Sequence, residues 1–323
     1  MLADTEATRL AGLLTLSSLP IFLGGFGEDT GFEVSPKMRL LLSFFSAVIA
    51  GLLLNTWITR SGVPGLDWVL TITFCSILFT ITLSGGICHA MNLIDGLNGL
   101  SLGLTLMMAA SLAMISVQVG DAAMATLILA FAGSVAGIFA FNFPLGKLFL
   151  GDAGAYTIGH MLTWIAILLL NRNPEIAPLA LFLIFFWPIA DMLFSIVRRV
   201  RNGKPIDEPD RMHFHQLVMR AIELTIIRRK SVTNPLAATM IWPLAAVPIC
   251  LAVTFFNANI LAAISWILCF LVFVWTYISG IRAARFLSRA RKNNENLMQT
   301  IVREGLAKVR HAASRKTKSY PAE

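Results

Sequence analysis

Several short polar stretches interrupt an otherwise apolar chain, and each carries side chains that could do chemistry. In HAMNLIDGLNG, the residues Asn92, Asp95 and Asn98 are three positions apart, so on a helix they would lie along one face. Their oxygens suit a hard cation such as Mg²⁺, which takes one or two carboxylates together with phosphate oxygens and water. Helix capping by Asp95 or Asn98 is an equally good interpretation of this stretch by itself.

Acidic side chains stand at the ends of two other apolar runs. Glu28 and Asp29 are adjacent in GFGEDTGF, where they could hold a divalent cation or act as a base, although acids at helix ends are usually only solvated. Asp152 lies in the Gly-Asp-x-Gly turn of FLGDAGAY and could be a simple N-cap. Lys147, shortly before it, could attract an anion or extend its charge to the membrane interface.

Basic and histidine residues gather in RRVRNGKPIDEPDRMHFHQL. Arg211, His213 and His215 suit a phosphate or pyrophosphate, because Arg offers a bidentate fork and His adds a donor. A zinc pair is less favoured because no Cys or third His lies near, and ordinary loop histidines are a further alternative. Upstream, Asp191 is an ionisable residue inside an apolar run, where a charge costs about 3 kcal/mol and indicates a function by default. Near Pro188 it could instead stabilise a kinked backbone or pair with a loop Arg.

Membrane helices are the elements that must position these residues. The 323 residues are 56% hydrophobic and 14% charged, with a mean hydropathy of +0.73, whereas soluble domains have roughly 45–50% apolar and 25% charged residues. A spanning helix needs about 20 apolar residues, and a β-barrel would show alternating polarity instead. We therefore expect an all-α, polytopic membrane bundle. Its nine predicted spans are residues 10–26, 39–57, 67–87, 99–118, 122–141, 154–171, 176–197, 236–256 and 259–281.

The distribution of basic residues predicts the orientation of these spans. All Lys and Arg except Arg9, Arg60 and Arg172 fall on one side, which the positive-inside rule makes cytoplasmic. The N-terminus is then outside, and the loops 27–38, 88–98, 142–153 and 198–235 face the cytoplasm with all the polar stretches described above. Residues 1–281 would form the transmembrane domain. Residues 282–323 would form a basic cytoplasmic tail that contacts anionic lipid headgroups, and no aromatic interleaving supports nucleic-acid binding.

Acids and amides for a metal, together with Arg and His for phosphates, all lie on one predicted membrane face. The simplest ligand for such a site is a metal-bound diphosphate that meets a lipid. Taken in order, five motifs of the chain resemble those of the polyprenyl-phosphate N-acetylhexosamine-1-phosphate transferases, and the resemblance runs nearly end to end. These motifs are GEDTGFEVSPKMRLL, NLIDGLNGL, FLGDAGAYTIG, PIADMLFSIVRR and PDRMHFHQL.

The resemblance implies an enzyme of the bacterial inner membrane. It would transfer an N-acetylated sugar 1-phosphate from a UDP-sugar to undecaprenyl phosphate, release UMP, and begin the synthesis of an O-antigen-like polysaccharide. Its cofactor would be Mg²⁺, with Mn²⁺ as an alternative, held by Asn92 and Asp152. The residues expected to act in catalysis are Glu28, Asp29, Asp95, Asp152, His213 and His215. The residues expected to bind substrate are Asn92, Asn98, Lys147, Asp191 and Arg211.

Three features differ from the family pattern. Glu28 stands where the acidic pair usually begins with Asp, and Gln216 stands where the family has a third His. Family members also have about two further spans before the acidic pair, so we expect this chain to lack the first two transmembrane helices. Two other readings are a transporter or flippase with Asp191 as a coupling residue, and an inactive truncated paralogue. Transport is less favoured because polar residues cluster at one face and no internal repeat is visible, and the sequence leaves a homodimer open.

Overall fold

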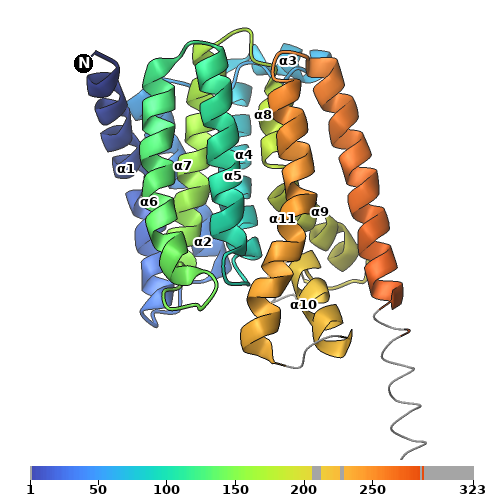
Figure 1. Ribbon diagram of the computed structural model, residues 1–323. Coiled ribbons are helices and arrows are strands. Elements are labelled where there is room, and N and C mark those ends of the chain that lie inside the picture. The colour runs from blue at the N-terminus through green and yellow to red at the C-terminus, as the bar shows by residue number, and fades with distance from the viewer. Residues whose placement is uncertain (1, 206–211, 226–228, 284–285, 287–323) are drawn as a thin grey trace, which may run out of the picture.

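Helices make up all the regular structure in the part of the chain that the computed structural model describes, which is residues 2–205, 212–225, 229–283 and 286 (Figure 1). Eight of these helices are long and apolar enough to cross a membrane, or nine if one bent pair counts as a single span. The predicted all-α membrane bundle is therefore confirmed. The helices are α1 (Leu2–Asp29), α2 (Pro36–Leu54), α3 (Pro64–Leu70), α4 (Thr73–Ile94), α5 (Leu100–Gln118), α6 (Ala122–Asn142), α7 (Gly151–Arg172), α8 (Pro178–Ile184), α9 (Phe186–Arg201), α10 (Phe214–Thr225), α11 (Lys230–Thr254) and a last helix, Asn259–Ala283.

Two of the predicted spans are interrupted. The span predicted at 67–87 is divided between α3 and α4, because Ile72 has an extended backbone. The span predicted at 176–197 is a bent pair, in which α9 turns away from α8 by 77°. Pro188 explains the position of this second break, because it has no N–H for the carbonyl of Ile184 and its ring clashes with that residue in a continuous helix. α8 accordingly ends at Ile184.

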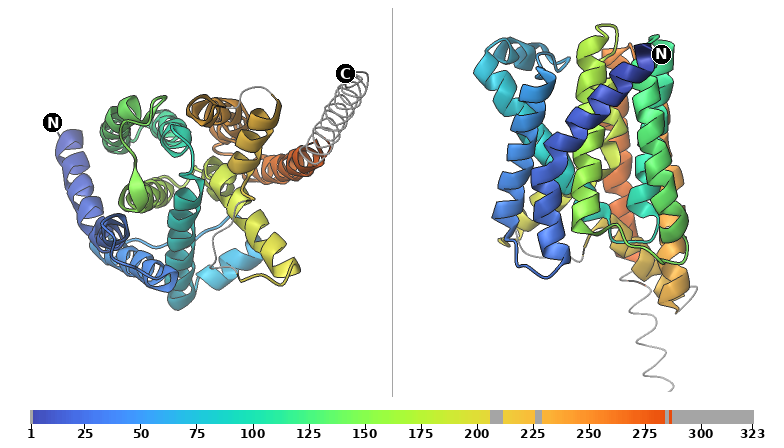
Figure 2. Two further views of the ribbon diagram at one scale, coloured as in Figure 1. Left: turned by 90° about the horizontal axis from the view of Figure 1, so that it is seen from below. Right: turned by 90° about the vertical axis from the view of Figure 1, so that its left-hand side faces the viewer.

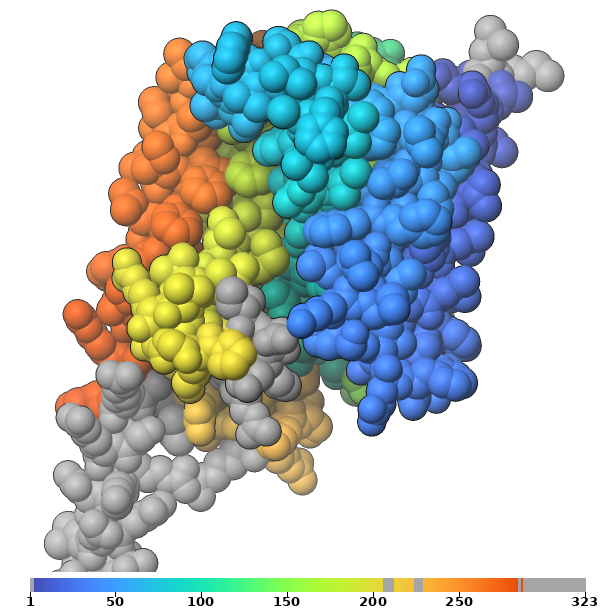
Figure 3. All heavy atoms as spheres, turned by 180° about the vertical axis from the view of Figure 1, so that it is seen from behind, coloured from blue at the N-terminus to red at the C-terminus, as the bar shows by residue number. Residues whose placement is uncertain are grey.

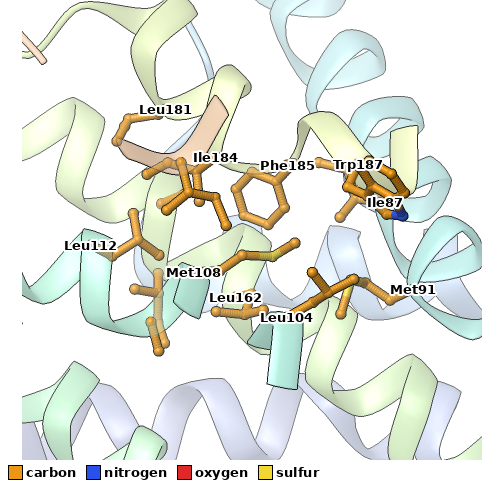
Figure 4. Close-up of a cluster of buried hydrophobic side chains, with 14 of the residues drawn as sticks. Ile87, Met91, Leu104, Met108, Leu112, Leu162, Leu181, Ile184, Phe185 and Trp187 are labelled. Atoms are coloured by element: carbon orange, nitrogen blue, oxygen red, sulfur yellow. The ribbon is translucent and has the colours of Figure 1, made fainter. Parts of the chain in front are cut away.

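α7 is the most deeply buried of the described spanning helices. It packs against α1 on one side and α4 on the other, and it also contacts α2, α5, α6 and α8. Apolar side chains from α4, α5, α7 and α8 fill the space between these helices, among them Met91, Leu104, Met108 and Leu162 (Figure 4). The residues that begin and end α7 are thus held by neighbours on several sides.

Both ends of α7 are capped by side chains from other parts of the chain. The carboxylate of Asp29, the last residue of α1, accepts the backbone N–H groups of Asp152 and Ala153, each at 2.9 Å. At the other end, the Arg60 guanidinium donates to the carbonyls of Leu170, Asn173 and Ile176 at 2.7–2.9 Å. Helix ends leave such backbone groups unpaired, and the helix dipole favours an acid at the N-terminus and a base at the C-terminus. These two contacts therefore fix α7 along its axis.

The polar stretches gather at one end of the bundle, which we call the polar end. Here α1, α4 and α6 end, and α2, α5, α7 and α11 begin, while the N-terminal residues of α1 lie at the opposite end (Figures 1 and 2). Large apolar side chains such as Leu23, Phe45 and Leu129 are exposed along the outer helices, as expected of surfaces that face lipid. Residues 206–211, including the predicted substrate-binding Arg211, lie outside the described residues, as does nearly all of the predicted tail 282–323.

Candidate active site

The acidic pair lies where α1 meets the start of α7. Asp29 caps α7 as described, and Glu28 Oε2 accepts the backbone N–H of Val34 at 2.9 Å, which closes the turn between α1 and α2. Close approach depends on Gly25, because a Cβ there would lie 2.5 Å from the backbone of Ala153. Both predicted catalytic acids therefore already accept backbone hydrogen bonds.

One alternative for Asp152 was that it is the N-cap of the helix that follows it. This alternative is wrong. α7 begins at Gly151 with Leu150 at the cap position, so Asp152 lies in the first helical turn. No side chain of this segment caps the helix, and Asp29 supplies the missing acceptors instead. The carboxylate of Asp152 is consequently available for other partners.

Asp152 meets one side chain from α4 and another from α2. Asn92 Nδ2 donates to its Oδ1 at 3.0 Å, and Arg39 Nη1 forms an ion pair with its Oδ2. The two residues expected to bind a metal thus lie in direct contact. In the sequence, Arg39 is one basic residue among many, although a base in the first turn of a helix opposes the helix dipole and so calls for a nearby acid.

The turn after α4 departs from expectation. Helix α4 ends at Ile94 and Asp95 is its C-cap, so Asn92, Asp95 and Asn98 do not share a helical face. Neither Asp95 nor Asn98 caps α5, whose N-cap is Gly99 with φ +79°. The predicted geometry of this stretch is therefore wrong, because the glycines and Asn98 form a tight turn between two spans.

The side chain and the backbone of Asn98 are both hydrogen-bonded to neighbouring segments. Its side-chain amide donates to the carbonyl of Pro144 at 3.2 Å, and its backbone N–H donates to Asn234 Oδ1 at 2.7 Å. Beside it, the N–H of Gly99 donates to Asn142 Oδ1 at 2.6 Å. Asn142 and Asn234 were missed in the sequence because each is an isolated amide at a helix end. Together they hold the turn in place against α6 and α11.

Asp95 lies in an electrostatically unusual position. Burial, together with the negative charges of Asp152 and Asp29, raises the pKa of Asp95 to about 7. The carboxylates of Asp29, Asp95 and Asp152 therefore lie near one another. Arg39 forms an ion pair with Asp152. A bound cation would relieve this repulsion.

The donor atoms at this site fit Mg²⁺ better than zinc. A zinc site made by the protein alone requires at least three His, Cys, Asp or Glu ligands in one place. Within the described ranges, no group of three such side chains is arranged in this way. Mg²⁺ instead uses one or two carboxylates and completes its octahedron with substrate phosphates and water. Asp152 and Asn92 are the residues that would hold it.

The two histidines of the described part of the loop lie side by side. His213 Nδ1 pairs with Asp191 Oδ2 at 2.9 Å, and Asp191 Oδ1 accepts the N–H of Phe214 at 3.0 Å. The His213 and His215 rings are parallel with centroids 5.8 Å apart. His215 Nε2 lies against Gly96, where a Cβ would come within 2.5 Å, so the histidines adjoin the turn that carries Asp95. Burial lowers the pKa of His215 to about 4, which makes it neutral at pH 7.

The predicted position and partners of Asp191 need correction. Because α9 bends away from α8, Asp191 is not in a continuous span, and it pairs with His213 rather than with a loop Arg. It is 2% exposed, so its carboxylate orients His213 and does not face an open site. Lys147, by contrast, is exposed on the segment between α6 and α7.

Comparisons with known proteins identify similar chains. Residues 11–170 match the family model described as Glycosyl transferase family 4. A probable undecaprenyl-phosphate N-acetylglucosaminyl 1-phosphate transferase of Bacillus subtilis is 28% identical over 66% of this chain, which spans 59% of that relative. Undecaprenyl-phosphate alpha-N-acetylglucosaminyl 1-phosphate transferases are 26% identical in Escherichia coli O157:H7 (86% of this chain, 76% of the relative) and 27% identical in Salmonella typhi (92% and 82%).

Proposed function

We propose that this chain is a member of glycosyl transferase family 4, whose family model matches residues 11–170, and that it is a phosphotransferase acting on undecaprenyl phosphate. The donor would be a UDP-linked N-acetylated sugar, whose sugar 1-phosphate moves to the lipid as UMP leaves. The reaction would take place at the polar end, on the cytoplasmic side of the bacterial inner membrane, and would begin an O-antigen-like polysaccharide. The observation that carries this proposal is the contact between Asn92 and Asp152, two oxygen-bearing side chains from separate spans at the membrane boundary.

Phosphoryl transfer depends mainly on positioning and on neutralising charge. When bound, Mg²⁺ would neutralise the donor diphosphate at Asp152 and Asn92. Asp29 holds the first turn of α7, so it fixes the direction in which Asp152 points. Asp191 similarly orients His213, which leaves the other ring nitrogen of that residue to contact a phosphate or sugar oxygen.

The lipid nucleophile needs little help from a base. A phosphate monoester has a second pKa near 6, so most of it is ionised at neutral pH. Glu28 and Asp29 also accept backbone hydrogen bonds in this structure, as expected of acids that shape the site. The acidic pair is therefore better suited to positioning than to proton transfer.

An apolar cavity supports a lipid acceptor. Its volume is about 320 Å³, and its walls come from α3, α4, α7 and α8, including Leu83, Ile87, Ile167 and Phe182. In Figure 3 the yellow-green residues of α8 lie in a recess between the cyan residues of α3 and α4 and the orange residues of the last helix. Ile87 is five residues before Asn92 on α4, about 7.5 Å along the helix. From Ile87 the cavity extends toward Arg60 and Leu170 at the opposite end of the bundle, so a hydrocarbon chain in it would approach the polar end only at Ile87.

A transfer assay tests the proposal. Membranes containing the protein are incubated with a radiolabelled UDP-N-acetylhexosamine and undecaprenyl phosphate, and UMP and the lipid-linked product are measured. Release of UMP with labelled lipid supports the transferase. Uptake of label without UMP would support transport instead, and binding without either product would support an inactive paralogue. Glu33→Ala, which removes an exposed acid beside the site, is the matched control for Asp152→Ala.

A further inference from the structure

A second group of polar side chains extends from Asp152 into the bundle. It consists of Arg39 on α2, His89 on α4 and Tyr156 on α7. His89 is three residues before Asn92, and Tyr156 is four residues after Asp152, so the two lie about 4.5 and 6 Å further into the bundle. The rings of His89 and Tyr156 confirm a common level, since their centroids are 5.0 Å apart in an edge-to-face arrangement.

Arg39 and His89 have unused hydrogen-bonding capacity. Arg39 uses Nη1 for Asp152, but its buried Nε has no partner. His89 Nε2 is likewise buried without a partner. Buried polar atoms are nearly always paired, and unpaired ones cost free energy. One such nitrogen in the Arg39 guanidinium and another on His89 therefore indicate a site for an anionic ligand.

We propose that Arg39, His89 and Tyr156 bind the phosphate group of the lipid acceptor. Arg39 supplies a permanent charge and a planar fork that matches phosphate oxygens, and His89 and Tyr156 supply one further contact each. Contacts link the three: the rings of His89 and Tyr156 lie edge to face, and Arg39 pairs with Asp152, one turn before Tyr156 on α7.

The position of this group favours the lipid over the nucleotide. Attacking and leaving oxygens lie roughly in line across a transferred phosphoryl group. UMP must leave toward water, so the attacking phosphate should approach from the membrane side of Asp152, where these three residues lie. Met38, Leu40 and Leu41, which flank Arg39 in the sequence, are 49%, 38% and 60% exposed. A headgroup could therefore reach Arg39 from the lipid-facing surface of α2.

This inference rests on the proposed acceptor, so its test measures binding as well as turnover. Affinities for undecaprenyl phosphate and for undecaprenol are compared in the purified full chain, because their ratio isolates the contribution of the phosphate. The variants are Arg39→Gln, His89→Phe, which keeps a ring against Tyr156, and Tyr156→Phe, which removes only a hydroxyl. Lys37→Gln is the matched control, since it removes an exposed charge from the same turn of α2.

Arg39→Gln and His89→Phe should each lower the phosphate-to-alcohol affinity ratio about tenfold or more, as expected for hydrogen bonds to a charged group. Tyr156→Phe should lower it about threefold, and Lys37→Gln should leave it unchanged. The KM for the acceptor should rise in parallel, while binding of the UDP-sugar stays within about twofold of wild type.

The inference is overturned if the wild-type chain binds undecaprenol as tightly as undecaprenyl phosphate, or if Arg39→Gln and His89→Phe leave the ratio unchanged. It is also overturned if these variants weaken UDP-sugar binding as much as acceptor binding, because the group would then serve the donor. A wild-type chain that binds the lipid phosphate but transfers no sugar would contradict the proposed function alone. Normal transfer with an unchanged ratio in the variants would contradict this inference alone.

Discussion

Replacing Asp29 by Asn distinguishes a carboxylate that positions α7 from one that accepts a proton. Its two oxygens accept the N–H groups of Asp152 and Ala153, each at 2.9 Å. Asn keeps one acceptor and turns an NH₂ group toward the other N–H, so one charge-assisted hydrogen bond is lost. Such bonds contribute about 1.5–3 kcal/mol. Because this junction is partly exposed, we expect a loss of about 1.5 kcal/mol, or about tenfold in kcat/KM.

The measurement is the pH dependence of initial transfer rates. Asp29→Asn should lose about tenfold at every pH with an unchanged profile, and Asp29→Ala, which removes both acceptors, should lose about a hundredfold. Glu33→Gln, an exposed acid on the adjoining turn, should retain the full rate. A loss above about a thousandfold in Asp29→Asn, together with disappearance of the acidic limb, would show proton transfer by Asp29 and refute the capping argument.

Four further outcomes are expected. Asp152→Ala should abolish transfer, and EDTA should stop the wild-type reaction until Mg²⁺ is added; indifference to EDTA would exclude the metal. Gly96→Ala should displace His215, because its Nε2 would lie 2.5 Å from the new methyl group. The KM for the UDP-sugar should then rise about tenfold. An unchanged KM would show that His215 does not belong to the donor site. The raised pKa of Asp95 is about 7, so its proton competes with a cation. Mg²⁺ affinity measured by calorimetry should therefore rise with pH through that value, and Asp95→Asn should flatten this pH dependence. A wild-type Mg²⁺ affinity that does not change with pH would contradict the prediction.

Local patterns were sufficient for most of the helices. Runs such as 99–118 and 122–141 are apolar for the thickness of a bilayer, and a chain in lipid must satisfy its backbone groups within each run. The observed bounds, Leu100–Gln118 and Ala122–Asn142, differ from the predictions by a single residue. The break after Ile184 was harder to predict from the sequence, because a proline such as Pro188 often kinks a helix without dividing it. The 77° bend depends on what the two halves pack against.

The site was predictable where residue type alone decides its chemistry. Asn92 and Asp152 were expected to converge, and they are hydrogen-bonded to each other. Polar side chains at the same membrane boundary avoid the lipid and so pack against one another. Asn98 was misplaced because its partners, Pro144 and Asn234, are distant in sequence. Arg39 was overlooked as a site residue for the same reason, since its significance lies in the ion pair with Asp152.

The sequence by itself determined that this protein is a bundle of membrane helices with polar chemistry at one end, because hydropathy and residue type act through local interactions with lipid and water. Only the tertiary structure decided how the acids divide their tasks. Asp29 caps α7, Asp191 orients His213, and Asp152 remains available at the centre. The physical reason is that a carboxylate's role depends on which N–H groups and charges lie within about 3 Å of it, and those neighbours come from helices that are far apart along the chain.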